Sequence, residues 1–69
     1  MTLRNHLRAR REAKGETQAE LAGSLGVSRQ TIISLEAGRY APSLELALRI
    51  ARHYGDMVEE IFVLDDERS

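Results

Sequence analysis

The stretch that begins at Thr17 constrains the fold of this chain more than any other part. Thr17 is followed three residues later by Glu20, the spacing of a capping box, which predicts that a helix begins here. Gly26 stands where this helix would end, because glycine adopts the left-handed conformation of a helix C-terminus at least cost. Ser28 follows closely and is a good N-cap for a second helix. The spacing predicts a helix-turn-helix over residues 18–36, a pattern more specific than either helix alone.

The apolar residues of these two predicted helices are spaced so that they can pack against each other. Leu21 and Leu25 form the stripe of the first helix. Ile32 and Leu35 are three residues apart and therefore share one face of the second helix. Ala22 is small and lies four residues before the glycine, so that the two helices can cross closely. We expect these residues to form part of the core.

The other side of the second helix is polar. Arg29, Gln30 and Ser34 fall on this side. Arginine matches the two acceptors of guanine in the major groove, and glutamine matches the acceptor and donor of adenine. Taken alone, nine residues would be better interpreted as an ordinary amphipathic helix with a solvated face. The helix-turn-helix that contains them favours DNA recognition instead.

Five segments of the sequence together resemble the lambda repressor and Cro type of DNA-binding domain, the Xre family, from Leu7 to Phe62. They are residues 11–15, 17–22, 26–32, 36–38 and 42–48. The short stand-alone regulators that include the cytolysin repressor are similar in length. The resemblance implies a mainly α fold, a five-helix lambda-repressor-like DNA-binding domain with a short C-terminal β-strand, as one domain over residues 1–69.

The resemblance also implies roles for individual residues at matched positions of the motif. Gln18 would contact a phosphate and brace Gln30, and Arg11 would pair with Glu36 to hold the first helix against the third. The alternative for the pair is two independent surface charges, and Tyr40 could instead cover an edge of the core. The implied DNA contacts, in bases or phosphates, are Gln18, Ser28, Arg29, Gln30, Thr31, Ser34, Arg39 and Tyr40.

Three further helices are expected outside the helix-turn-helix. The first spans residues 4–14 and is strongly basic. The fourth runs from residue 44 to about 54, and Ser43 caps it. Asp56 and Glu59 form a second capping box, which predicts a short fifth helix to about residue 60 or 61. The apolar face of the fourth helix consists of Leu44, Ala47, Leu48 and Ala51, flanked by Leu46 and Ile50.

Two residues depart from the pattern of the family that the sequence resembles. Glu16 replaces an apolar residue just before the capping threonine, which removes one expected packing contact. Ile33 stands where a small or polar residue is common. It could touch a thymine methyl group or pack on a neighbouring loop, and the sequence does not separate these alternatives.

The apolar run Ile61, Phe62, Val63 and Leu64 lies just before an acidic end. A lone strand would leave backbone groups unpaired, so we expect a two-fold homodimer formed through residues 61–65. Residues 1–3 could add a strand. The alternative is that Ile61, Phe62 and Leu64 pack into the chain's own core. A two-fold dimer would place two base-reading helices about 34 Å apart on an inverted repeat.

Charge and composition favour a DNA-binding role over other classes of function. Residues 1–55 hold nine Lys and Arg against five Asp and Glu, a net of +4, whereas residues 56–69 have a net of −5. The absence of cysteine and of a histidine–carboxylate cluster predicts no metal, no cofactor and no enzymatic activity. No apolar run suits a membrane span or a signal peptide, so we expect a cytoplasmic protein with no membrane and no small-molecule partner.

The sequence therefore predicts a DNA-binding transcriptional regulator, with repression by promoter occlusion as the default. The alternative is an antitoxin-type interaction module that also binds its own promoter. Few polar residues remain after the predicted strand to engage a toxin, which disfavours this alternative.

Overall fold

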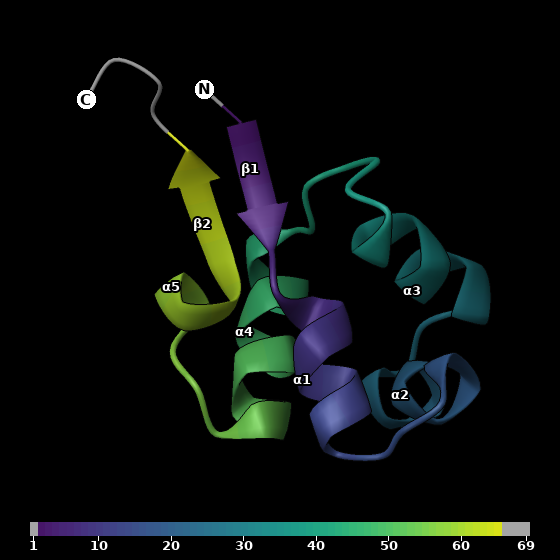
Figure 1. The fold of residues 1–69 in the computed structure, drawn as a ribbon. Helices are drawn as coiled ribbons and strands as arrows, with labels where there is room; N and C mark the ends of the chain where they lie inside the picture. The colour runs from purple at the N-terminus through teal and green to yellow at the C-terminus, as the bar shows by residue number, and fades with distance from the viewer. Residues whose placement is uncertain (1, 66–69) are drawn as a thin grey trace.

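The computed structural model describes residues 2–65, which form five helices and a two-stranded sheet. The helices are α1 (Leu7–Ala13), α2 (Gln18–Leu25), α3 (Arg29–Glu36), α4 (Leu44–Tyr54) and α5 (Val58–Ile61), and the strands are β1 (Thr2–Asn5) and β2 (Phe62–Asp65). Figure 1 shows the sheet on one side of the helices and the α2–α3 pair on the opposite side. The predicted mainly α, five-helix fold is confirmed. Within the described residues no helix is long and apolar enough to cross a membrane.

The core lies where the helices converge. Its fully buried members come from all five helices, so each helix contributes to one common interior. Full burial of a large apolar side chain stabilises the folded state by about 1.5–3 kcal/mol. This cluster is therefore the main source of stability. The fully buried large side chains are Leu7, Leu21, Ile32, Leu35, Ile50 and Ile61.

The N-terminal residues form a strand where the sequence predicts the first turn of a helix. Arg4 and Asn5 belong to β1, and α1 begins only at Leu7. Asn5 stops the strand, because its side-chain oxygen accepts from the Leu7 amide at 3.1 Å and its Nδ2 donates to the carbonyl of Leu35 at 2.9 Å. The predicted start at residue 4 is therefore wrong, since pairing with the C-terminal strand overrides local helix propensity.

The strand predicted at the C-terminal end exists, and its partner within the chain is β1. The two strands are antiparallel, with Leu3 opposite Leu64 and Asn5 opposite Phe62. Ile61 is the last residue of α5 rather than part of the strand, which corrects the predicted start. Of the predicted acidic end, residues 66–69 lie outside the described residues, as does Met1 of the possible N-terminal strand.

Helix α4 has the predicted bounds but a different buried face. Ser43 caps it by accepting from the Leu46 amide at 3.1 Å, and Gly55 ends it in the left-handed conformation. The buried side chains are Ala47, Ile50 and Ala51, whereas Leu44 and Leu48 are 73% and 50% exposed. The predicted face is thus rotated, because a broad apolar helix cannot show which of its stripes meets the core.

Helix α5 begins one residue later than predicted. Met57 is its N-cap, and the carboxylate of Glu60 accepts from the Met57 amide at 2.7 Å. Asp56 forms an ion pair with Arg10 of α1 at 2.5 Å instead of capping the helix. The capping box predicted for Asp56 and Glu59 is wrong, since this ion pair engages the aspartate elsewhere.

Candidate nucleic-acid interface

Local hydrogen bonds fix the junction between α2 and α3. The Thr17 hydroxyl accepts from the amide of Glu20 at 3.0 Å, and the Glu20 carboxylate accepts from the amide of Thr17 at 2.8 Å. Gly26 has φ 71°, which turns the chain after α2. The hydroxyl of Ser28 then accepts from the Thr31 amide at 3.1 Å and opens α3. These contacts set the angle between the two helices of the motif.

Helix α3 separates its apolar and polar residues cleanly. Ile32 and Leu35 are fully buried, so the helix cannot rotate without exposing them. Ser28, Arg29 and Gln30 are exposed, and Thr31 and Ser34 are half-buried. Along this surface Gln30 Nε2 donates to Ser34 Oγ at 3.3 Å, and the hydroxyls of Ser28 and Thr31 lie 2.9 Å apart. The predicted base-reading residues therefore occur on one accessible surface.

A polar cluster holds the C-terminal end of α3. Arg11 binds the Glu36 carboxylate at two points, with Nε 2.6 Å from Oε2 and Nη2 3.2 Å from Oε1. The two side chains are only 12% and 6% exposed. This hydrogen bonding raises the pKa of Arg11 despite the opposing effect of burial. The structure brings this pair together, and a bidentate geometry fixes orientation as well as adding energy.

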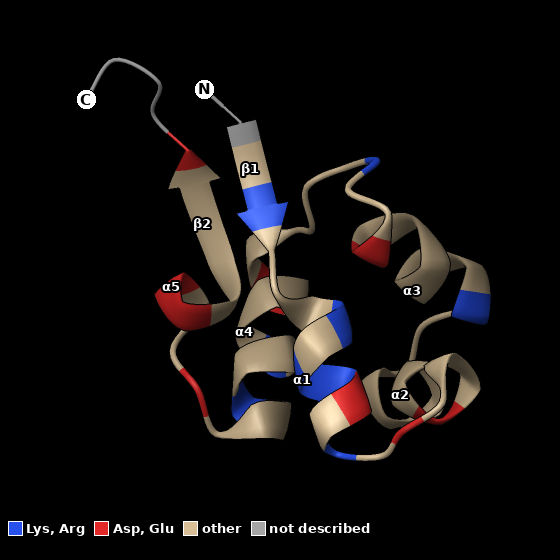
Figure 2. Ribbon diagram, viewed as in Figure 1, with Lys and Arg blue, Asp and Glu red and all other residues tan. Residues whose placement is uncertain are grey.

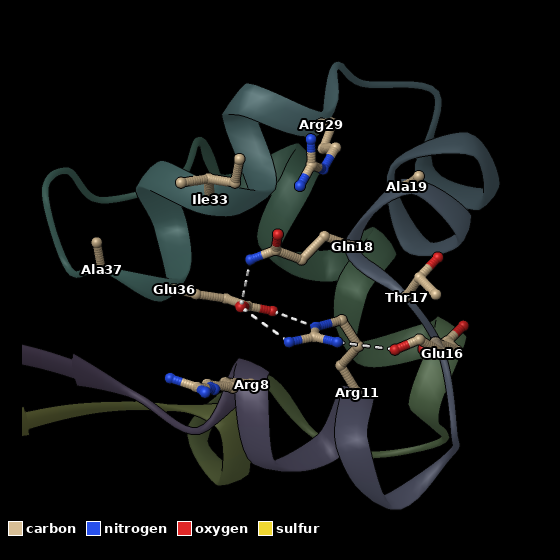
Figure 3. A pocket seen from close by; sticks show the side chains of 10 residues that line it. All are labelled: Arg8, Arg11, Glu16, Thr17, Gln18, Ala19, Arg29, Ile33, Glu36 and Ala37. Atoms are coloured by element: carbon tan, nitrogen blue, oxygen red, sulfur yellow. Dashed lines mark hydrogen bonds and ion pairs between the residues drawn. The ribbon is translucent and has the colours of Figure 1, made fainter.

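Gln18 joins the same cluster. Its Nε2 donates to Glu36 Oε1 at 3.1 Å (Figure 3). Gln30 instead donates to Ser34 Oγ. The brace that the sequence analysis expected between Gln18 and Gln30 is therefore wrong in this structure. The reason is that the Glu36 carboxylate is a stronger acceptor than a neutral amide. Gln18 nevertheless lies at the first residue of α2, where free backbone amides favour an anion.

An open hollow of about 810 Å³ lies between α1, the start of α2 and α3. Figure 3 shows Arg29 extending from the start of α3 toward Gln18, with Arg11 and Glu36 on the floor. Arg8, which the sequence analysis treated only as part of a basic helix, also lines the hollow. The complete lining is Arg8, Arg11, Glu16, Thr17, Gln18, Ala19, Arg29, Ile33, Glu36 and Ala37.

Basic and acidic residues are partly separated in the described part of the molecule. Figure 2 shows basic residues on α1, at the start of α3 and in the loop before α4, and acidic residues on α5 and at the end of β2. Acidic residues also lie on α1, on α2 and at the end of α3, and a basic residue lies on β1. Arg39 and Tyr40 belong to that loop, and both are exposed. Arg39 is thus on the basic side, and Ile33, half-buried in α3, lines the hollow there. This distribution suits a polyanion that approaches α3.

The residues predicted for a dimer interface divide into two groups. Ile61 is fully buried and Phe62 is 9% exposed, so both belong to the chain's own core. Val63 is half-buried, and Leu64 is 64% exposed. The alternative of internal packing therefore describes Ile61 and Phe62, whereas Leu64 is not part of the core.

One polar cluster was missed by sequence analysis. Glu16 contacts His53 and Tyr54 of α4 through its carboxylate. The signal was present, because a carboxylate in place of an apolar residue needs polar partners when it is partly buried. Nothing in the sequence identified those partners, which lie 37 and 38 residues away.

Comparison with known families agrees with this geometry. The family model described as "Helix-turn-helix" matches residues 7–57. The chain belongs to the Xre-type helix-turn-helix family. Members of this family are DNA-binding transcriptional regulators and not enzymes, so the predicted class of function is confirmed.

Relatives of similar length also support the assignment of this chain to the Xre-type family. An uncharacterized HTH-type transcriptional regulator of Methanothermobacter thermautotrophicus is 54% identical, over 94% of this chain and 96% of its own. One from Methanocaldococcus jannaschii, with the same description, is 48% identical over 94% and 98% of the two chains. The similarity extends beyond the helix-turn-helix, because it covers nearly the whole of each chain.

Solved structures also share the fold. A candidate DNA-binding protein of Bacteroides fragilis superposes with a TM-score of 0.79 at 21% identity, over 88% of this chain and 98% of its own. The clp gene regulator ClgR of C. glutamicum superposes with a TM-score of 0.69 at 37% identity, over 78% and 70%. The first likeness concerns the fold alone.

Proposed function

We propose that this Xre-type protein is a sequence-specific repressor that binds an inverted-repeat operator as a homodimer, with α3 of each subunit in the major groove. The observation that supports this most is the exposed polar surface of α3 above two fully buried residues, Ile32 and Leu35. A recognition helix needs both properties, because it must present side chains to base edges while the core holds its orientation.

Base recognition is assigned to Arg29, Gln30 and Ser34. Arg29 would bind a guanine through two donors, and Gln30 an adenine through its amide. The hydroxyls of Ser28 and Thr31 would lie near the backbone or a base edge. Each good base contact discriminates against a wrong base by about 1–3 kcal/mol.

Phosphate contacts are assigned to Gln18 at the start of α2 and to Arg39 and Tyr40 in the loop after α3. Free amides at a helix N-terminus and an exposed arginine both favour an anion. These contacts would set the register of the protein on DNA and raise affinity for every sequence.

The homodimer is supported by apolar side chains that the single chain leaves exposed. Leu44 and Leu48 stand one turn apart on α4 and therefore share a face, and Leu64 is exposed on β2. Val63 is half-buried and, as the neighbour of Leu64 on the strand, points to the opposite face of the sheet. A second copy could cover these groups, and a small domain gains stability from such association.

Selection from random double-stranded DNA tests the function. The expected result is an enriched inverted repeat with half-site centres about 34 Å apart, one turn of the double helix. Arg29→Ala should relax preference at one position of each half-site, whereas Arg52→Ala, an equal charge change on exposed α4, should leave the preference unchanged. Failure to enrich any sequence would contradict the assignment of α3.

The oligomeric state is tested by light scattering of the full chain and of Leu64→Asp. We expect a dimer for the former, and a shift toward monomer for the latter at equal concentration because a carboxylate would be buried at the interface. Glu59→Gln, an exposed change on α5, is the control. A monomeric wild-type chain would exclude the proposed interface, and a reporter gene under the selected operator would then test repression by a monomer.

A further inference from the structure

A partly buried polar cluster connects the loop before α2 to helix α4. The carboxylate of Glu16 accepts from the Tyr54 hydroxyl at 2.8 Å, and its other oxygen lies 2.6 Å from Nε2 of His53. The side chains of Glu16 and His53 are 12% and 18% exposed. Solvent therefore screens this contact less than an exposed surface pair.

The backbone of Glu16 belongs to a second set of contacts. Its carbonyl accepts from Nη1 of Arg11 at 2.8 Å, and the same guanidinium holds Glu36 (Figure 3). Glu36 in turn accepts from Gln18. A continuous chain of hydrogen bonds thus runs from α4 through Glu16 to α1, α3 and the first residue of α2.

Glu16 also directly precedes Thr17, the N-cap of α2. Only Thr17 lies between Glu16 and the first residue of α2. A shift of the Glu16 backbone would therefore also move the start of α2. The start of α2 carries Gln18 and the free amides, the groups assigned above to a phosphate.

The protons of the cluster can be assigned from its geometry. Burial alone would raise the pKa of Glu16, but the hydrogen bonds from Tyr54 and His53 and the nearby charges of His53 and Lys14 outweigh it and lower the pKa. Glu16 is therefore an ionised acceptor, and a nitrogen 2.6 Å from it must donate. His53 Nε2 accordingly bears a proton, and Lys14 Nζ donates to the His53 carbonyl at 3.4 Å.

Other charged groups surround His53. Lys14 Nζ is also 3.4 Å from His53 Nε2, on the same ring nitrogen that contacts Glu16. The titratable and charged groups that face His53 or line the hollows beside it are Arg10 of α1, Lys14 just after α1, Glu16 of the loop, Arg49, Arg52 and Tyr54 of α4, and Asp56 after α4.

We propose that Glu16 is a positioning residue for the DNA-contacting start of α2, and that protonation of His53 strengthens this positioning and therefore DNA binding. The neutral ring donates to Glu16 through Nε2 alone, and the imidazolium adds a full charge to the same bond. Because Glu16 is already ionised, protonation of the ring turns a hydrogen bond to a carboxylate into a hydrogen-bonded ion pair, in which the attraction is stronger. The inference rests on the proposed function, in which the start of α2 contacts a phosphate.

Operator affinity between about pH 8 and about pH 5.5, the range in which histidine changes charge, tests this proposal. Wild-type affinity should rise about fivefold as the pH falls, a modest coupling between two sites. His53→Gln, which retains a side-chain donor but cannot titrate, should remove this rise. His6→Gln is the matched control, because His6 is exposed and its side chain has no part in the cluster. An equal pH dependence in His53→Gln would overturn the proposal.

A second variant distinguishes positioning from simple stabilisation. Glu16→Gln preserves an acceptor for Tyr54 but removes the charge that the imidazolium would face. We expect weaker operator binding without the pH response, at a temperature where the variant remains folded by circular dichroism. A lower melting temperature combined with unchanged affinity and an unchanged pH response would show a structural role only and would overturn the proposal.

A measurement without DNA separates failure of this proposal from failure of the proposed function. The amide resonances of Thr17, Gln18 and Ala19 should shift with the titration of His53 in the free wild-type chain, and should not do so in His53→Gln. Shifts without any operator binding would contradict the proposed function and retain the mechanical coupling. Operator binding without such shifts would contradict the coupling and retain the function.

Discussion

Arg11 of α1 holds Glu36, the last residue of α3, by two hydrogen bonds, so the proposed recognition helix is anchored at its C-terminal end. The anchor leaves the exposed side chains at the start of α3 free to contact a ligand. It also spans 25 residues of sequence, and so ties the N-terminal helix to the helix-turn-helix. Desolvation offsets much of the attraction in such a pair, which suggests that it specifies geometry more than it adds stability.

Breaking this ion pair from one side should destabilise the fold strongly. Glu36→Leu leaves the Arg11 guanidinium buried without its counter-charge, at a cost of about 3 kcal/mol in the free energy of unfolding. The double variant Arg11→Met, Glu36→Leu should be more stable than Glu36→Leu alone, because no buried charge remains. Urea denaturation measures the free energy of unfolding of each variant, and equal m values make these energies directly comparable. A double variant less stable than the single one would show that the attraction outweighs desolvation.

The two glycines near the end of α2 should respond to alanine in opposite directions. Gly26 has φ 71°, so Gly26→Ala should lower the free energy of unfolding by about 1 kcal/mol, although nothing nearer than 3.9 Å would meet the new Cβ. Gly23 lies inside the helix with open space around it, and Gly23→Ala should raise stability by about 0.5–1 kcal/mol. Thermal melts of both variants decide this. Changes of the same sign would contradict the backbone explanation.

Loss of Arg39 should weaken binding to all DNA sequences alike. An exposed arginine that neutralises one phosphate contributes about 0.9 to the slope of log affinity against log salt concentration. In the proposed homodimer both subunits lose this contact, so Arg39→Ala should reduce the slope by about 1.8, twice that amount, and leave the preferred sequence unchanged. Arg52→Ala, with the same loss of charge on α4, should retain the wild-type slope. A changed sequence preference in Arg39→Ala would place this arginine at a base instead.

Glu16 should make the fold sensitive to acid. Its pKa in the folded chain is lowered from the ordinary value of 4.5, with burial outweighed by the bonds from Tyr54 and His53. The folded state therefore binds fewer protons, so the stability from this group is present above the ordinary pKa and is lost as the pH falls through the folded pKa. Glu16→Gln should reduce the loss of stability between about pH 5 and about pH 3. Urea unfolding at several pH values measures the stability of the wild type and of Glu16→Gln. If Glu16 were not involved, both would lose the same free energy of unfolding in this pH range.

Tyr54 should resist ionisation in alkaline solution. Burial raises its pKa first, and the hydrogen bond to the Glu16 carboxylate raises it further. Because the pKa of Tyr54 is raised on folding, Tyr54 contributes to the free energy of unfolding below the ordinary pKa of tyrosine. This contribution is lost as the pH rises toward the pKa in the folded state. In a Tyr40→Phe background, phenolate absorbance should appear only together with unfolding. Absorbance that rises in the folded state would contradict the buried contact.

The sequence by itself determined the helix-turn-helix, because its signals are local. The capping box at Thr17, the left-handed Gly26 and the cap at Ser28 each depend on residues within one or two turns, and the structure forms all three contacts. The family resemblance likewise pointed to Arg11 and Glu36, which the structure places in contact. Local hydrogen bonding and matched motif positions are thus enough for the helices and much of the candidate interface.

Only the tertiary structure decided features that depend on distant partners. Strand β1 extends over Arg4 and Asn5, where a helix was expected, because β2 supplies its hydrogen bonds from the other end of the chain. Asp56 does not cap α5 because Arg10 engages it, and the buried stripe of α4 follows from its neighbours. Glu16 contacts His53 and Tyr54, which are 37 and 38 residues away in the sequence. Such pairings have no local signal, since they depend on which side chains the packed helices bring within hydrogen-bonding distance.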